Sequence, residues 1–396
     1  MKHIVIAGGG FAGLSAAGVA AEENDLNAGD LRITMVSPSD WTVIRPRLYE
    51  ADPETLRAPL RPALDPIGVA FVQDAVERID TAARTLHLRG GGALQYDALI
   101  LATGSELPPL PVPGVAEHTW NIDSYDAAVA FDRHLRDVVR TPDLPGHDTF
   151  VIVGGGMTGI ELACEMRSRI AVHADADTAA GARIVLVERE TSIGPEFGDN
   201  PRPVIEAALA QAGVETRLGC AVAGFEPGRV LLADGTAIGA ATAVVTVGLR
   251  ANGLTAEIPG RRDELGRLVV DDFQRVVGVP GVYATGDVAR APVDDDAHVA
   301  LMSCQHARTM GKYAGYNVAH DLLGLDPRPY RQPDYTTCLD LGAAGAVFTM
   351  GWDRDVQTTG AEAKKRKEMI NREWIYPPAG TREEVFAALR IDARGR

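Results

Sequence analysis

The sequence predicts an α/β fold with two parallel-sheet units, the second inserted into the first, followed by a smaller α+β domain. A β-branched strand, a glycine-rich turn and an Ala-rich helix follow one another at residues 3–21, and the same order returns at residues 150–170. Because this order builds one β-α unit of a parallel sheet, its recurrence predicts two such units. The chain has 396 residues, 46% of them hydrophobic, enough for about two or three domains.

The first turn carries the glycine spacing that a bound pyrophosphate requires. Strand residues 3–7 lead into Gly8, Gly10 and Gly13. Gly8 makes the tight turn, Gly10 lets the backbone approach a pyrophosphate, and Gly13 lets the helix pack closely on the strand. The helix N-terminus then offers free N–H groups to the negative charge. The second strand ends at Ser37, where an acidic residue is usual, and its hydroxyl is expected to hold a ribose.

The second turn repeats this spacing at Gly154, Gly156 and Gly159. Two copies in one chain are far more specific than one, so we expect two Rossmann-like dinucleotide-binding domains. The following strand ends in Glu188, whose carboxylate suits a free ribose 2′-hydroxyl and repels a 2′-phosphate. This favours NADH over NADPH, while the neighbouring Arg189 keeps NADPH open.

Two further segments have the form of a buried strand that stops at small or acidic residues. Ala102, Thr103 and Gly104 end one of them, and Gly286 and Asp287 end the other. Open α/β sheets bind ligands at the carboxyl ends of their strands, so Asp287 is expected to reach a polyol or ribityl chain there.

Charge and chain pattern exclude several classes of function. The formal net charge of -15 argues against nucleic acids, which proteins bind through Lys and Arg. There is no apolar run of about 18 residues for a transmembrane helix, and the start at Met1 leaves no room for a signal peptide. We therefore expect a cytoplasmic protein. Four cysteines stand far apart, without the short spacing of a metal site, so no metal is expected.

Taken together, the motifs resemble the two-dinucleotide-binding-domain flavoproteins, and among them the type II NADH dehydrogenases. The resemblance spans nearly the whole chain, since both glycine motifs, residues 101–104 and residues 285–287 occur in the expected order. It implies FAD, a nicotinamide dinucleotide and a small electron acceptor. The FAD site is then expected at Gly8, Gly10, Phe11, Ala12, Gly13, Ser37, Arg47, Ala102, Thr103, Gly104, Gly286 and Asp287. The dinucleotide site is expected at Gly154, Gly156, Met157, Thr158, Gly159 and Glu188.

The resemblance also places two candidate catalytic residues beside the reacting rings. Glu161 matches the glutamate that such enzymes hold near the nicotinamide. Quinone-reducing members usually read Ala-Gln-x-Ala-x-Gln beside the flavin, whereas residues 300–305 read ALMSCQ and keep only Gln305. Hydride transfer needs neither residue as an acid or base, so both are expected to orient the rings. Arg47 fits the acceptor side, a contact to the FAD pyrophosphate or an ordinary surface loop. His306 fits a proton donor, or a helix histidine that faces solvent or bonds a carbonyl, and the second role is favoured.

The cysteines argue against thiol chemistry. No cysteine precedes Cys164, so the redox pair that thiol reductases carry in the first domain is missing. Cys304 and Cys338 are close enough to the motifs to approach the flavin, but small buried hydrophobes are the favoured role. The leading prediction is an NAD(P)H oxidoreductase that passes electrons to a quinone or quinone-like acceptor. A flavin-dependent tailoring enzyme of a specialised metabolite and a redox-sensing flavoprotein without catalysis stay open as alternatives.

The domain boundaries follow from the same pattern. The FAD domain is predicted at residues 1–112 and 250–325, the NAD(P)H domain at 113–249, and the C-terminal domain at 326–396. In the last of these, a basic cluster beside Trp374 fits either the inner face of a membrane or a solvated helix face. Thr381 and Glu384 form a capping box for a final helix, whose apolar stripe fits the core, a membrane or a second subunit. A homodimer is therefore one of three expectations.

Overall fold

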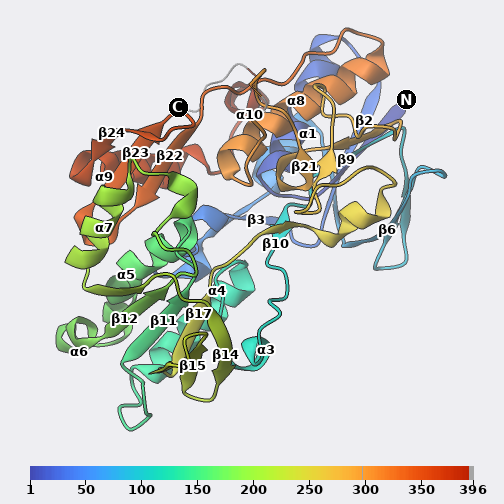
Figure 1. The fold of residues 1–396 in the computed structure, drawn as a ribbon. Coiled ribbons are helices and arrows are strands. Elements are labelled where there is room, and N and C mark those ends of the chain that lie inside the picture. The colour runs from blue at the N-terminus through green and yellow to red at the C-terminus, as the bar shows by residue number, and fades with distance from the viewer. Residues whose placement is uncertain (297, 392–396) are drawn as a thin grey trace.

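The structure is a computed structural model that describes residues 1–296 and 298–391. It has the predicted α/β architecture, with two open parallel sheets flanked by helices and a small antiparallel sheet near the C-terminus (Figure 1). The first sheet takes its strands from residues 2–101 and 282–284, and the second sheet is inserted between them. Residues 392–396, which the predicted C-terminal domain includes, lie outside the described part.

The first sheet has the strand order β20-β9-β1-β2-β5, and all its pairs are parallel. Its strands are β1 (Lys2–Ala7), β2 (Leu31–Ser37), β5 (Ala70–Gln73), β9 (Ala98–Leu101) and β20 (Val282–Ala284). Ile4, Val5 and Ile6 in the central strand β1 are fully buried, as expected for an apolar run in a sheet covered on both faces. The carboxyl edge of such a sheet stays free for ligands.

Two helices, α1 (Phe11–Leu26) and α8 (Cys304–Leu323), cross at close range over this sheet. A Cβ at Gly311 would lie 2.2 Å from the Ala12 carbonyl oxygen, and one at Gly315 would lie 2.3 Å from that of Ala16. Only glycine allows the two backbones to approach this closely. The crossing therefore fixes the start of α8, including Gln305, relative to the first glycine turn.

The second sheet has the order β13-β12-β11-β17 and is also parallel. Its strands are β11 (Thr149–Val153), β12 (Arg183–Val187), β13 (Val214–Arg217) and β17 (Thr242–Val245). The helices α4 (Tyr125–Val138), α5 (Met157–His173) and α7 (Arg202–Gln211) share its apolar core. Both sheets thus follow one design, which confirms the predicted pair of Rossmann-like units.

The C-terminal part forms an antiparallel sheet of β22 (Thr336–Asp340), β23 (Ala346–Met350) and β24 (Asp355–Thr359). Helix α9 (Gly360–Met369) and a short π-helix (Ile370–Trp374) follow this sheet. The last helix, α10 (Arg382–Leu389), starts with the predicted capping box of Thr381 and Glu384. Its apolar stripe packs on α1, where a Cβ at Gly18 would lie 2.3 Å from the Leu389 side chain. The stripe therefore belongs to the core of this chain.

Shorter elements connect these layers. They are β3 (Trp41–Val43), β4 (Arg57–Pro59), α2 (Arg61–Leu64), β6 (Val76–Asp80), β7 (Thr85–Leu88), β8 (Ala93–Gln95), β10 (Ser105–Glu106), α3 (Val115–His118), α6 (Ala176–Gly181), β14 (Val222–Glu226), β15 (Arg229–Leu232), β16 (Ala237–Gly239), β18 (Arg250–Ala251), β19 (Leu268–Val269) and β21 (Ala289–Arg290). Within residues 1–296 and 298–391, no helix combines the length and the apolar character that crossing a bilayer requires.

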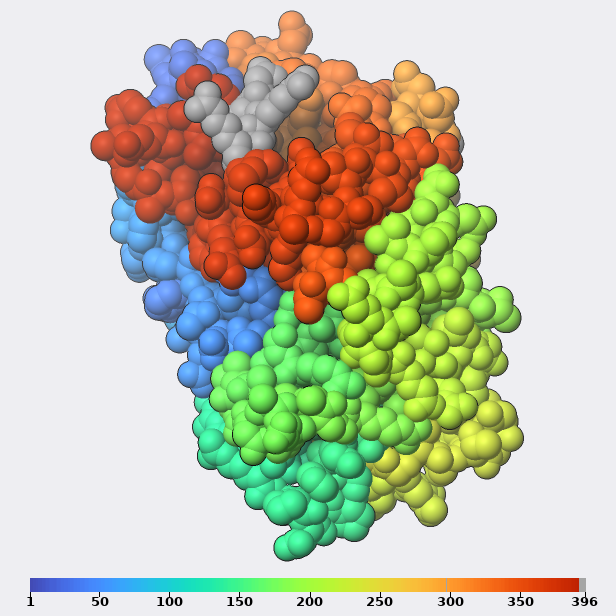
Figure 2. All heavy atoms as spheres, turned by 90° about the vertical axis from the view of Figure 1, so that its left-hand side faces the viewer, coloured from blue at the N-terminus to red at the C-terminus, as the bar shows by residue number. Residues whose placement is uncertain are grey.

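The C-terminal part lies against both parallel-sheet units. Figure 2 shows it in orange and red, in contact with the light green segment around residue 200 and with the blue first unit. Asn200 Nδ2 donates to the Asp353 carbonyl at 2.8 Å and to the Asp355 carboxylate at 3.2 Å. These bonds join the second unit to the turn between β23 and β24.

We predict that Gly315→Ala destabilises the protein by about 1–3 kcal/mol, because the added methyl group would push α8 away from α1. Gly181→Ala is the matched control. Gly181 ends helix α6, and no described atom lies within 4 Å of its Cβ position, so this change should stabilise by at most about 1 kcal/mol. Urea unfolding followed by tryptophan fluorescence measures both. Equal unfolding midpoints for the two variants would contradict the close helix crossing.

Candidate functional site

Both glycine turns lie at the carboxyl edge of their sheet, and their backbones require glycine. Gly8 has φ +118° and Gly154 has φ +111°, a region that other residues rarely adopt. A Cβ at Gly13 would lie 1.9 Å from the Gly8 carbonyl oxygen, and one at Gly159 would lie 1.8 Å from that of Gly154. The two turns therefore share one geometry, in which a helix starts at the sheet edge.

The first turn forms an open, polar cradle. No described atom lies within 4 Å of the Cβ positions of Gly10 or Gly104, and no side chain caps the N-terminus of α1. The buried hydroxyls of Thr103 and Thr285 have no hydrogen-bond partner within the described residues. Buried hydroxyls usually have a partner, which a ligand or a water can supply. The cradle therefore fits the pyrophosphate and polyol of a dinucleotide.

The other residues predicted for this turn gather around it. Phe11, Ala12 and Ala102 pack together in one small apolar cluster. The backbone at Gly286 lies against Ala12, and the Ser37 hydroxyl lies close to the backbone of the turn. The residues that sequence patterns assigned to one site are therefore neighbours in space.

Asp287 is partly buried beside this cradle and already has two partners. It accepts a hydrogen bond from Ser105 Oγ at 2.6 Å, and Arg45 Nη1 lies 3.8 Å from its carboxylate. Burial raises the pKa of the Asp287 carboxyl, and the Ser105 hydrogen bond opposes that rise. A carboxylate held in this way can accept hydrogen bonds from a polyol at a fixed position.

Arg47, a predicted ligand of the pyrophosphate, is instead bonded within the protein. Its guanidinium binds Glu50 with contacts of 2.7 and 3.0 Å and donates to the Tyr376 hydroxyl at 2.8 Å. These contacts tie the first unit to the C-terminal part. Arg45 is the arginine that the structure places next to Asp287.

The second turn is filled by two carboxylates of the chain itself. Glu188 accepts hydrogen bonds from the N–H groups of Gly155 at 2.6 Å and Glu190 at 2.9 Å. Glu196 accepts from the Met157 N–H, at the first position of α5, at 2.9 Å. A carboxylate offers about four acceptor sites, so Glu188 can still accept from a ribose hydroxyl.

The remaining residues predicted for the second turn lie at the same helix start. A Cβ at Gly156 would lie 2.9 Å from Glu196 Oε1, and the side chain of Thr158 is exposed. The motif therefore forms an accessible helix N-terminus, with Glu196 against it. Nothing in the glycine pattern points to Glu196, which follows β12 in a loop.

The two predicted catalytic residues are tied to opposite ends of strand β22. Glu161 Oε1 accepts from the Asp340 N–H at 3.0 Å, and Gln305 Oε1 accepts from the Thr336 hydroxyl at 3.4 Å. A strand rises about 3.3 Å per residue, so these anchor points stand about 13 Å apart. Strand β22 thus fixes the position of one residue from α5 relative to one residue from α8.

Glu161 is buried in an ion pair with helix α9. Lys367 Nζ lies 2.7 Å from Glu161 Oε1, and both side chains are buried. Burial raises the pKa of Glu161 to about 7, against the opposing effects of Lys367 and of the Asp340 N–H. Burial alone would lower the pKa of Lys367, but the charge of Glu161 and its hydrogen bond, together with Asp340 and Cys338, outweigh burial and raise that pKa. The Glu161 carboxyl therefore changes its protonation near neutral pH.

Three charged residues of α5 share one buried face. Glu161, Glu165 and Arg169 recur every fourth residue, which places them on the same side of the helix. Glu165 lies 3.4 Å from Lys364, and Arg169 donates to the Tyr49 carbonyl at 3.4 Å. The face thus joins the second unit to α9 and to the first unit. The spacing is visible in the sequence, although the glycine motifs do not point to it.

His306 lies in an aromatic cluster. The residue is fully buried, its Nδ1 lies 2.9 Å from Ser303 Oγ, and its ring stacks on Tyr335 with centroids 5.1 Å apart. Burial lowers the pKa of His306 to about 4. At neutral pH it is therefore an uncharged member of the cluster, and the solvent-facing position predicted as one of its alternatives is wrong.

The four cysteines are free thiols, and three of them have a raised pKa. Burial raises the pKa of Cys164 to about 12 and that of Cys338 to about 11, and it also raises the pKa of Cys304. The thiolate is the reactive form of cysteine, so these thiols are poor nucleophiles at neutral pH. This supports the structural role predicted for them.

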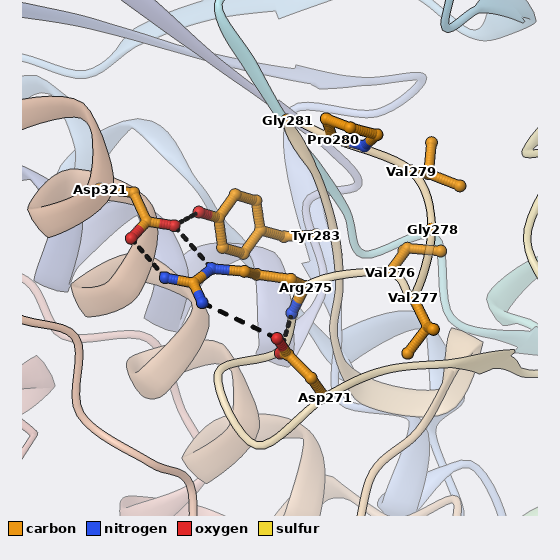
Figure 3. Close-up of a pocket in the computed structure, with 10 residues that line it drawn as sticks. All are labelled: Asp271, Arg275, Val276, Val277, Gly278, Val279, Pro280, Gly281, Tyr283 and Asp321. Carbon is orange, nitrogen blue, oxygen red and sulfur yellow. Dashed lines mark hydrogen bonds and ion pairs between the residues drawn. The ribbon is translucent and has the colours of Figure 1, made fainter.

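A surface hollow of about 500 Å3 lies at the other end of the first sheet (Figure 3). Residues 276–281 line it and lead into β20, which places it at the amino edge, opposite the glycine turn. Arg275 pairs there with Asp321 and Asp271, and Tyr283 donates to Asp321. The polar groups of the hollow thus bind one another, and the candidate site remains at the carboxyl edges.

We predict that Lys367→Met destabilises the protein by about 3–5 kcal/mol at about pH 8, because Glu161 would lose its cation and would have to stay ionised unpaired or take up a proton. The loss should be smaller at about pH 5.5. A buried carboxyl whose pKa is raised by folding stabilises the fold below its unfolded pKa, and this contribution is lost as the pH rises through the folded pKa. Removing Lys367 raises the folded pKa of Glu161 further, since Lys367 lowers it.

Lys365→Met is the matched control for this prediction. Lys365 is exposed on the same helix, so its replacement should change the free energy of unfolding by less than about 0.5 kcal/mol. Urea unfolding of both variants at the two pH values gives the comparison. If Lys367→Met lowers the free energy of unfolding equally at both pH values, the prediction is contradicted, because the ionisation of Glu161 would then not cause the loss.

Comparisons with known proteins agree with this geometry. The profile of a family described as pyridine nucleotide-disulphide oxidoreductase matches residues 2–311. A protein of Mycobacterium tuberculosis named NADH dehydrogenase-like is 45% identical over 393 residues, which cover 98% of each chain. A type II NADH:quinone oxidoreductase of Staphylococcus haemolyticus is 24% identical over 394 residues, which cover 96% of each chain.

A solved structure shows the same fold. The sulfide:quinone oxidoreductase of the hyperthermophilic bacterium Aquifex aeolicus superposes with a TM-score of 0.78 at 18% identity, covering 99% of this chain and 92% of its own. The predicted resemblance to type II NADH dehydrogenases and the predicted oxidoreductase class are therefore confirmed. The chain belongs to the pyridine nucleotide-disulphide oxidoreductase family, whose members use a flavin and NAD(P)H, and it is an enzyme of that class.

Proposed function

We propose that this enzyme oxidises NADH and passes the electrons through FAD to a quinone or quinone-like small molecule. The observation that carries the proposal is the position of β22. This strand holds Glu161 at one end and Gln305 at the other. Glu161 belongs to α5, which starts at the second glycine turn, and Gln305 belongs to α8, which crosses the helix of the first. Two nucleotides bound at those turns would therefore extend toward Glu161 and Gln305, which are both bonded to β22.

The first turn suits FAD, because its cradle is open and lined by unused hydroxyls. Gly10, Thr103 and Thr285 would border the pyrophosphate and polyol, and Asp287 would accept from the polyol. Bound FAD supplies the redox chemistry by accepting a hydride and releasing electrons to the acceptor. The protein binds and orients the reactants and limits their contact with water. We infer the domain limits given above from the same arrangement.

The second turn suits NADH, because Glu188 directly follows β12, the position from which an acidic residue binds the ribose in such domains. Its buried carboxylate is fixed by two N–H groups and repels a 2′-phosphate. Glu161 lies further along α5 and is held by Lys367 and the Asp340 N–H. A carboxyl fixed in this way can accept a hydrogen bond from the nicotinamide carboxamide, which orients the ring without moving a proton.

The quinone is supported by an aromatic cluster next to Gln305 and by the Staphylococcus haemolyticus relative, which is named as a type II NADH:quinone oxidoreductase. Trp352 stacks on Tyr335 with centroids 5.0 Å apart and on His298 with centroids 4.4 Å apart. Within the described residues, Trp352 Nε1 and His306 Nε2 are buried without a hydrogen-bond partner. Aromatic faces with unused donors suit a planar acceptor that carries carbonyl oxygens.

Stopped-flow spectroscopy tests the proposal. Mixing with NADH should bleach the flavin rapidly, NADPH should do so more slowly, and a soluble quinone should restore the oxidised spectrum. Slow reduction with a long-lived charge-transfer band would favour the redox-sensing alternative. Product formed from a metabolite with oxygen consumed in step would favour the tailoring enzyme. A protein that takes up no FAD would refute all three.

We predict that Glu188→Ser shifts the preference toward NADPH by about tenfold or more in kcat/KM, because it removes the negative charge that faces the 2′-phosphate. Glu190→Ser is the matched control, since Glu190 is exposed two residues further on. Its preference should stay within about twofold of the original protein. Steady-state rates with both coenzymes give the ratio, and an unchanged ratio in Glu188→Ser would place the ribose elsewhere.

A further inference from the structure

We propose that Glu196 occupies the pyrophosphate position of the second nucleotide site, and that it pairs with Arg354 when a dinucleotide displaces it. The proposal rests on the NADH site proposed above. It makes Glu196 a competitor of the pyrophosphate and Arg354 the cation that receives the displaced carboxylate. The two residues come from different parts of the fold, the loop after β12 and the turn between β23 and β24.

Glu196 holds the position at which a helix N-terminus binds an anion. Its Oε1 accepts from the Met157 N–H at 2.9 Å, and a Cβ on Gly156 would lie 2.9 Å from the same oxygen. Gly156 is the glycine at which the backbone must approach the pyrophosphate. Carboxylate and phosphate oxygens compete for the same N–H groups. Glu196 must therefore leave before a pyrophosphate can bind there.

The side chain of Glu196 is exposed, and nearby negative charge favours its displacement. The residue is exposed and follows Gly194, whose φ of +56° turns the chain into the short helical turn Pro195–Phe197. Exposed side chains exchange rotamers rapidly. Burial of its inner face raises the pKa of Glu196, and the neighbouring Glu188 raises it further. A pyrophosphate would add more negative charge to this pair and would push the mobile carboxylate out.

Arg354 is a buried cation with unused donors. The residue is 6% exposed, and its guanidinium covers the Tyr335 ring at 4.1 Å. Within the described part of the chain, neither its Nε nor its Nη1 has a hydrogen-bond partner. Its backbone has φ +56°, which is strained for a residue with a side chain. A buried guanidinium without an anion is unfavourable, so these features point to an anion that arrives from outside the turn.

The two groups already act on each other. Burial lowers the pKa of Arg354, and Tyr335 and Glu196 oppose that fall, while Arg354 lowers the pKa of Glu196 in turn. The segments that carry them are fastened together, because Asn200 donates to the Asp353 carbonyl at 2.8 Å. Within this fixed frame, a movement of the Glu196 side chain can complete the ion pair.

The exchange would leave each of these charged groups paired, including Arg354, which lacks an anion before it. The pyrophosphate takes the N–H groups at the start of α5, and Glu196 takes the donors of Arg354. Occupancy of the nucleotide site is thereby linked to the C-terminal sheet, whose strand β22 also holds Glu161 and Gln305. NADH binding would then hold the C-terminal sheet more firmly against the second unit, and with it the strand that binds Glu161 and Gln305.

Binding measurements test the first half of the proposal. Isothermal titration calorimetry on the FAD-loaded enzyme gives the Kd of NAD+ and of ADP-ribose, which keeps the pyrophosphate and lacks nicotinamide. Glu196→Gln should tighten both about three- to tenfold, because a neutral amide competes less for the helix N-terminus. Glu206→Gln, which changes the same charge on an exposed position of α7, should leave both values within about twofold. Weaker binding in Glu196→Gln would overturn the proposal, because Glu196 would then bind the dinucleotide itself.

Arg354→Met tests the second half. If Arg354 receives the displaced carboxylate, the substitution should weaken NAD+ binding about three- to tenfold in the original protein and less than about twofold in Glu196→Gln. Equal weakening in both backgrounds would overturn the pairing, because Arg354 would then bind the pyrophosphate directly. If Arg354→Met does not fold, Arg354→Lys replaces it, with a smaller weakening that again depends on Glu196.

The same data separate this proposal from the function on which it rests. If the original protein binds neither NAD+ nor ADP-ribose, the proposed NADH site is wrong and the exchange falls with it. If the original protein binds both and Glu196→Gln leaves both Kd values unchanged, the NADH site stands and the exchange is overturned.

Discussion

The ion pair between Glu161 and Lys367 is the contact on which the arrangement of the site depends. Both side chains are buried, and charged groups are stable in such a place only when they are paired and hydrogen-bonded. Helix α5 belongs to the second unit and α9 to the C-terminal part, so neither can bury its charge alone. The pair therefore holds α9 against α5, and the Asp340 N–H, which binds the same carboxylate, holds the end of β22 there.

The two glycine turns share a backbone geometry but differ in what lies against their helices. The start of α1 is open, with unused hydroxyls around it, whereas the start of α5 carries Glu188 and Glu196. An open cradle suits a cofactor that stays bound through many turnovers. A turn protected by the chain's own carboxylates suits a substrate that comes and goes. The difference agrees with the roles we propose for FAD and NADH.

The family takes its description from disulphide reduction, yet this chain lacks the chemistry for it. No cysteine precedes Cys164, and burial keeps the pKa of Cys164 and Cys338 far above neutral. Electrons from the flavin must therefore go to an acceptor other than a protein disulphide of this chain. In the function we propose, the aromatic cluster of Tyr335, Trp352 and His298 beside Gln305 would contact this acceptor.

The sequence by itself determined what depends on short stretches of chain. Both glycine turns, their strands and helices, the capping box at Thr381 and the fold class follow from local spacing, because a tight turn or a helix start needs particular residues at fixed offsets. Only the tertiary structure decided which distant groups meet. Glu161 and Lys367, or Glu196 and Met157, are joined by the packing of separate elements, and no periodicity in the sequence encodes such contacts. Arg47 fitted three roles in the sequence, and the structure showed its bonds to Glu50 and Tyr376, because a long side chain takes the partner that packing brings near.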